Sequence, residues 1–227
     1  HALDLTEGQP AGHCVRSCWI GMHIGKALDL PSEQLWDLYY TLLLKDAGCS
    51  SNAARLFQLY GSDDRTTKQD FKLVDTDHTA QVLRFVIDHA GAGHGLAKRL
   101  GRLFKLARQG EELATELITT RCERGADIAR RLGFNEDVAA GIHSLDEHWN
   151  GRGRPLGLQG DAIPIGARIA LFAQVIDVFH TTAGADAALD ELVGFELDDV
   201  VALVGDRATG DGDFGFRVVI GLVQLLD

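Results

Sequence analysis

Apolar and small residues recur at helical spacing near the start of the chain. Between His13 and Leu28 they form two adjacent rows, the first with His13, Ser17, Ile20 and Ile24 and the second with Cys14, Cys18, Gly21 and Gly25. This spacing is typical of a helix. Because glycine has no side chain, the second row lets another helix approach closely. We therefore predict a helix over 13–28 whose second row is a packing seam.

The same periodicity predicts helices along most of the remaining sequence. Leu30-Pro31-Ser32 ends the first helix, and Ser32 is a suitable cap for the next. Breaks are expected at Gln109-Gly110 and at Gly133. The predicted helices are 33–47, a short one from about 52, 78–90, 94–108, 111–132, 136–148, one launched by Pro164, 185–204 and a closing one after Phe216. Strand signals are close to absent, so we predict an all-α bundle of about eight or more helices.

The stretch from Asp146 to Asp177 has the most unusual pattern. A loop with four glycines ends at Pro164 and leads into a helix that is apolar on every side, which is typical of a central helix. Its few polar residues are Arg168, Gln174 and Asp177, and each needs a partner if it is buried. We expect Arg168 and Asp177 to pair with each other.

Length and charge narrow the class of protein. The 227 residues fit one domain over 1–205, followed by a Gly/Asp loop and a short helix over 206–227. No apolar run is long enough to span a bilayer, and no signal peptide is evident. A net charge of −11 argues against a duplex nucleic-acid partner but leaves room for a local phosphate pocket. Four cysteines without CxxC spacing indicate a reduced, cytoplasmic setting.

The central stretch also carries a family pattern. Its scaffold residues include Glu147, Asn150, Gly151, Gly153, Pro155, Gly157, Gly160, Pro164 and Arg168. With these residues in these positions, the chain resembles the HD-GYP family over roughly residues 2 to 180. The resemblance implies a helical, metal-dependent phosphodiesterase that opens cyclic di-GMP. In such a site two or three ions of iron, manganese or a similar metal activate a bridging water.

The residues that would carry this chemistry are mostly replaced. By the resemblance, His13 keeps the first ligand histidine of the family, in the segment GHCVR. The other family positions hold Lys45-Asp46 for the His-Asp pair, Cys49 for a lysine, Arg121 for a histidine, Leu145-Asp146 for two histidines, Gln174 for an aspartate and Arg154 for a tyrosine. Cations at ligand positions repel a metal dication by several kcal/mol at short range. We therefore expect a degenerate site.

Three interpretations of these residues stay open. In the first, Lys45, Asp46, Arg121, Asp146 and Gln174 form a buried cluster of ion pairs and hydrogen bonds. In the second, the cationic side chains bind a phosphate, with Lys45, Arg121, Arg154 and Gln174 as ligand-binding residues.

In the third, one divalent metal (iron, manganese or zinc) is held by His13, Asp46 and Asp146, with Cys49 as a further ligand and Cys122 nearby. If the protein is active, Lys45 and Asp46 are the catalytic candidates. Alternatively, Cys49 and Cys122 respond to redox conditions, because Lys45 and Arg121 would lower a thiol pKa.

Three functional hypotheses follow. The favoured one is a non-catalytic regulatory or ligand-binding module related to cyclic di-GMP phosphodiesterases. Its alternative is an active phosphodiesterase for a cyclic dinucleotide with an altered metal-ligand set. The third is an interaction scaffold, a homodimer attached to further signalling domains in a longer chain.

Overall fold

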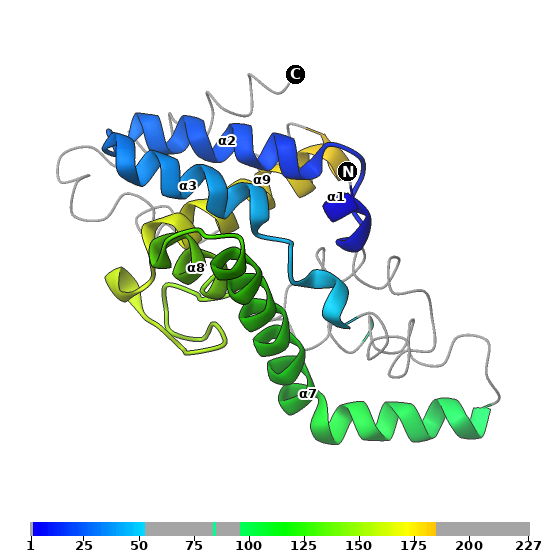
Figure 1. Ribbon diagram of the computed structural model, residues 1–227. Helices are drawn as coiled ribbons and strands as arrows, with labels where there is room; N and C mark the ends of the chain where they lie inside the picture. The colour runs from blue at the N-terminus through cyan, green and yellow to red at the C-terminus, as the bar shows by residue number, and fades with distance from the viewer. Residues whose placement is uncertain (1, 53–83, 85–95, 185–227) are drawn as a thin grey trace.

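The computed structural model describes residues 2–52, residue 84 and residues 96–184, with the side chains of 96–111 left aside (Figure 1). This part contains the α-helices α1 (Ala2–Thr6), α2 (His13–Ala27), α3 (Ser32–Leu44), α7 (Leu96–Arg131), α8 (Glu136–His143) and α9 (Ile165–Ala183). Two 3₁₀ turns, η1 (Cys49–Asn52) and η2 (Gly160–Ala162), complete it, and these residues include no strand. The prediction of an all-α protein is confirmed.

The core forms where α2, α3, α8 and α9 pack against one another, and Figure 1 shows α2 and α3 side by side with α9 behind them. Ile20, Leu42 and Ile176 contribute fully buried side chains from three of these helices. The seam predicted on α2 is confirmed. A Cβ added at Gly21 would lie 2.6 Å from the Leu42 side chain, and one at Gly25 would lie 2.5 Å from that of Leu38.

The predicted break at Gln109-Gly110 is wrong, because α7 runs without interruption from Leu96 to Arg131. A single glycine inside a helix costs only about 1 kcal/mol relative to alanine, so the helical pattern on both sides outweighs it. Figure 1 shows that α7 changes direction along its length. Glycine is one of the usual causes of such a bend.

The C-terminal half of the described chain begins with a capped helix. Asn135 accepts the N–H of Val138 through its side chain at 3.0 Å and so caps the start of α8. The glycine loop after α8 is held by Glu147, whose carboxylate accepts the N–H groups of Leu156 and Leu158 at 2.6 and 2.8 Å. The loop therefore has an internal anchor before Pro164 starts α9.

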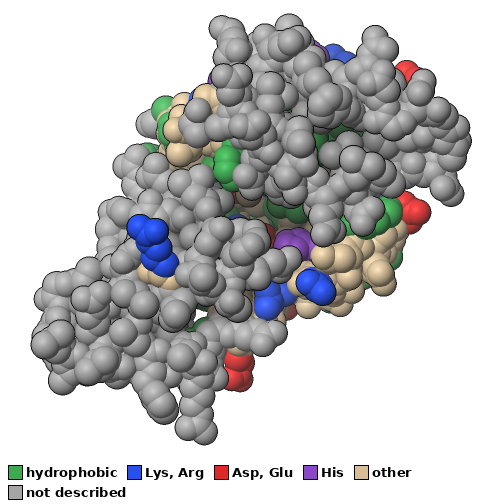
Figure 2. All heavy atoms as spheres, turned by 180° about the vertical axis from the view of Figure 1, so that it is seen from behind, with side chains coloured by type: hydrophobic (Ala, Val, Ile, Leu, Met, Phe, Trp, Pro, Cys, Tyr) green, Lys and Arg blue, Asp and Glu red, His purple; other side chains and the backbone are tan. Residues whose placement is uncertain are grey.

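Several predicted elements fall outside the described residues. These are the helix 78–90 apart from residue 84, the helix 185–204 and the closing helix after Phe216, together with the boundary between 1–205 and 206–227. Within the described residues, no helix has the length and apolar character needed to cross a bilayer. On the face drawn in Figure 2, the visible Lys and Arg side chains occur in small separate groups.

Candidate functional site

The site starts at the first residue of α2. Asp4 of α1 accepts the N–H of Gly12 at 2.9 Å and that of Cys14 at 2.8 Å, and so caps this helix with one carboxylate. The free N–H groups at a helix start need such acceptors. The cap fixes where α2 begins, and His13 consequently enters the interior with no exposed surface.

A carboxylate on α9 orients His13. Asp177 Oδ2 lies 2.6 Å from His13 Nδ1, and Asp177 also accepts from Arg16, with Oδ1 2.5 Å from Nε and Oδ2 3.2 Å from Nη2. Burial opposes ionisation of Asp177, but the bonds from His13 and Arg16 outweigh it and lower the pKa of the carboxyl. The expected Arg168–Asp177 pair is wrong, because Arg168 Nη1 lies 3.2 Å from Asp161 instead.

The other nitrogen of His13 faces a lysine. Lys45 follows directly after α3, and its Nζ lies 3.1 Å from His13 Nε2 and 2.8 Å from Gln174 Oε1. The same ammonium pairs with Asp46, which is buried like Lys45 itself. Four of the residues singled out in the sequence therefore meet at one point, where α2, the end of α3 and α9 converge.

A second group of candidates lies next to the first. Arg121 of α7 pairs with Asp146, and Cys122 Sγ lies 3.4 Å from Asp146 Oδ2. Cys49 is buried among Glu7, Arg121 and Asp46, all of which affect its titration. The first interpretation, a cluster of ion pairs and hydrogen bonds, agrees with these contacts. They form two neighbouring groups, one with Lys45, Asp46 and Gln174 and the other with Arg121 and Asp146.

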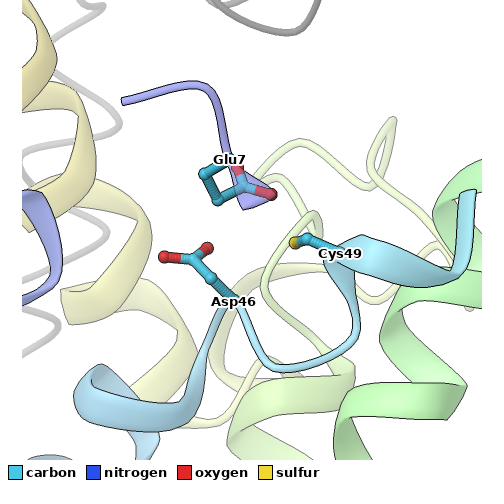
Figure 3. A group of neighbouring side chains, drawn as sticks. All are labelled: Glu7, Asp46 and Cys49. Carbon is cyan, nitrogen blue, oxygen red and sulfur yellow. The ribbon is translucent and has the colours of Figure 1, made fainter. Parts of the chain in front are cut away.

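Glu7, Asp46 and Cys49 form a group with atoms suited to metal binding, each within 4.8 Å of the others (Figure 3). Glu7 is not among the site residues predicted from the sequence, because it lies in a turn before α2 and outside the family pattern. Among the described residues this is the one such group with three or more members. It shares Asp46 with the ammonium of Lys45.

The residues at the family's metal positions do not fit a multinuclear metal centre. The Lys45 ammonium is bound to Asp46 and lies at hydrogen-bond distance from His13, which are the two retained ligands. A dication placed a few ångströms from this ammonium and from Arg121 would be repelled by several kcal/mol at an effective dielectric near 20. His13 and Asp146 also belong to different contact groups, with Asp146 paired to Arg121.

The candidate anion ligands also have protein partners. Lys45 and Arg121 are paired with Asp46 and Asp146 respectively, and Gln174 accepts from Lys45. Arg154 Nε donates to Thr115 of α7 at 2.8 Å. Binding of a phosphate by these four side chains stays a prediction, and it requires their present contacts to open.

Acid should weaken the cap of α2. Burial of Asp4 disfavours its charge, but the N–H groups of Cys14 and Gly12 lower its pKa below the ordinary value of 3.8. The unfolded chain therefore binds more protons in acid than the folded chain does. The contribution of Asp4 to the free energy of unfolding is fully present above about pH 4 and is lost as the pH falls below that value. We expect Asp4→Asn to lower the urea midpoint at pH 7 and to flatten the decline of this midpoint between pH 4 and pH 2.

The control for the cap is Asp127→Asn, which changes an exposed carboxylate of α7. This variant should keep the wild-type stability and the wild-type pH dependence. An Asp4→Asn protein whose stability declines with acid as steeply as the wild type would contradict the assignment of the cap.

The proposed redox role of the thiols is not supported by their surroundings. Burial, with Asp146 nearby, raises the pKa of Cys122 to about 12, and burial also raises that of Cys49 despite the neighbouring Arg121. All four cysteines are buried. Because the thiolate is the reactive form, we expect a thiol reagent at pH 8 to label the folded protein more than about a hundredfold more slowly than the denatured protein. Rapid labelling of Cys49 or Cys122 in the folded protein would contradict this.

The fold and the site define an all-α protein of the HD-domain type. A model of the HD domain family matches residues 90–190. The chain is 53% identical over 192 residues to 3'3'-cGAMP-specific phosphodiesterase 3 of Vibrio cholerae, covering 85% of this chain and 42% of the relative. A crystal structure of cyclic GMP-AMP specific phosphodiesterases of V. cholerae aligns with a TM-score of 0.61 at 41% identity, over 96% of this chain and 50% of the other.

The resemblance to the HD-GYP family that the sequence indicated is confirmed. It spans about half the length of the relatives it matches. The relatives are named for a cyclic dinucleotide, but for 3'3'-cGAMP and not for cyclic di-GMP. These comparisons support the phosphodiesterase alternative better than the non-catalytic module favoured from the sequence.

Proposed function

We propose that this chain is part of a phosphodiesterase that acts on a 3'3'-linked cyclic dinucleotide. The observation that carries the proposal is the 53% identity over 192 residues to a relative specific for 3'3'-cGAMP. The buried polar contacts at the meeting of α2, α3 and α9 lie where the family resemblance puts its site. The mixed guanine–adenine dinucleotide is therefore the first substrate to test.

The test compares the purified chain with the full-length gene product. Each is incubated with 3'3'-cGAMP or with cyclic di-GMP in buffer with Mn²⁺, and linear products are separated by chromatography. We expect the full-length protein to open 3'3'-cGAMP faster than cyclic di-GMP and to stop when a chelator is added. A full-length protein that leaves both dinucleotides intact would overturn the proposal.

A second candidate concerns the part that this chain plays in such an enzyme. The contact between Lys45 Nζ and the His13 and Asp46 side chains favours a domain that supports a metal centre located elsewhere in the full-length protein. The chain alone would then show no turnover and no stoichiometric metal, while the full-length protein shows both. Turnover by the isolated chain would exclude this candidate and support the chain itself as the catalytic part.

We also propose an assembly and a location for this protein. The proposal comprises a homodimer, a cytoplasmic location and additional signalling domains, the last supported by the fact that the chain spans about half the length of its relatives. Light scattering of the purified chain and of the full-length protein would test the dimer, with a monomer in both samples as the contradicting result.

A further inference from the structure

The ammonium of Lys45 has as many acceptors as it has hydrogens. A lysine ammonium has three N–H donors and no acceptor. Its acceptors here are the His13 imidazole at 3.1 Å, the Gln174 carbonyl oxygen at 2.8 Å and the Asp46 carboxylate. These three groups come from α2, from the turn after α3 and from α9. The ammonium thus joins three separate elements of the fold.

The acceptors have the character of metal ligands. Asp177 pairs with Nδ1 of His13, which leaves Nε2 with its lone pair toward Lys45. A histidine oriented by a carboxylate in this way is typical of metal sites. Lys45 and Asp46 are buried like His13, so bulk water screens the charges of the ammonium and the carboxylate only weakly. A cation at this point is needed electrostatically, and Lys45 supplies it from the chain.

We propose that the Lys45 ammonium is a built-in cation that takes the place of a divalent metal between His13, Asp46 and Gln174 and excludes a metal from this point. The ammonium excludes a metal both through its charge and through the space that it occupies. The ammonium pairs with the Asp46 carboxylate, and Nζ occupies the point on which the three acceptors converge. An added dication would lose these acceptors and be repelled by the ammonium.

The main test replaces the ammonium with a neutral ligand. In Lys45→His, an imidazole replaces the cation next to Asp46, and His13 and Asp46 become available to a metal. We expect the purified wild type to hold no stoichiometric transition metal, and Lys45→His to take up about one Mn²⁺ per chain. Excess Mn²⁺ should raise the thermal midpoint of Lys45→His by about 5 °C and leave that of the wild type unchanged.

Three control variants separate this site from adventitious binding. Lys45→Arg keeps the positive charge and should take up no metal. Lys26→His adds an imidazole at an exposed lysine of the same domain and should also take up none. The double variant Lys45→His with Asp46→Asn removes the carboxylate ligand and should lose the response to Mn²⁺ that the single variant shows.

Two results would overturn the proposal. The first is a wild-type protein that holds a transition metal which His13→Ala removes, since the ammonium would then not exclude it. The second is a folded Lys45→His protein, judged by circular dichroism, that takes up no Mn²⁺. If Lys45→His folds only when refolded with Mn²⁺, that dependence supports the proposal, and failure to fold in either condition contradicts it. These measurements use no nucleotide, so they are independent of the proposed phosphodiesterase activity.

Discussion

Asp177→Asn should lower the free energy of unfolding by about 3 to 5 kcal/mol, the range typical of breaking a buried ion pair. The carboxylate has no exposed surface and accepts from both His13 and Arg16. An amide of the same shape has no charge to offer Arg16. It also has only one oxygen to share between two donors, so a buried donor is left without a full partner.

The measurement is urea unfolding at pH 7, followed by circular dichroism. Asp161→Asn is the matched control, because Asp161 also pairs with an arginine but its side chain is 78% exposed. An exposed pair contributes about 0 to 1 kcal/mol, so this variant should stay close to the wild type. Equal stability losses in the two variants would contradict the role given to the buried carboxylate.

Gly48→Ala should destabilise the protein by at least about 3 kcal/mol, at the upper end of the range for overpacking. A Cβ at this position would lie 2.0 Å from the carbonyl oxygen of Arg121 and 2.7 Å from the N–H nitrogen of Gly125. Both atoms belong to the backbone of α7, so no side-chain rotation can relieve the clash. The substitution should push η1 away from α7 and disturb Cys49 next to it.

Gly166→Ala provides the comparison for this effect. Its added Cβ would meet Thr41 at 3.6 Å, which is ordinary contact, and the position lies inside α9. Alanine is favoured over glycine within a helix, so we expect no loss and a gain of up to about 1 kcal/mol. If thermal unfolding shows Gly48→Ala to be as stable as the wild type, the close approach of η1 and α7 is wrong.

Much of the fold follows from local pattern. The rows on α2 predicted both the buried face and a packing seam, because helical spacing places such residues on one side. Gly21 and Gly25 were expected to let a neighbouring helix approach closely. In the structure they lie against the side chains of Leu42 and Leu38 of α3. The predicted break in α7 is wrong, because the helix-destabilising effect of one glycine is smaller than the summed helix preference of the residues around it.

The partners of polar side chains were much harder to predict. Asp177 was assigned to Arg168 because both lie on α9, whereas its partners come from α2. Glu7 was not predicted as a site residue, although it lies beside Asp46 and Cys49. Such pairs depend on the packing of distant helices, which hydrophobic spacing does not report. The resemblance to a known family located His13, Lys45 and Gln174 at one site, but it did not indicate that Lys45 would contact the other two.

The His13–Asp177 contact joins residues 164 positions apart in the chain. Contacts with such high sequence separation slow folding, because a large loop must close before they form. During synthesis from the N-terminus, α2 and α3 leave the ribosome long before α9 exists. His13 and Lys45 therefore lack their partners on α9, Asp177 and Gln174, until that helix has been made. The polar centre of the domain is completed only when α9 docks.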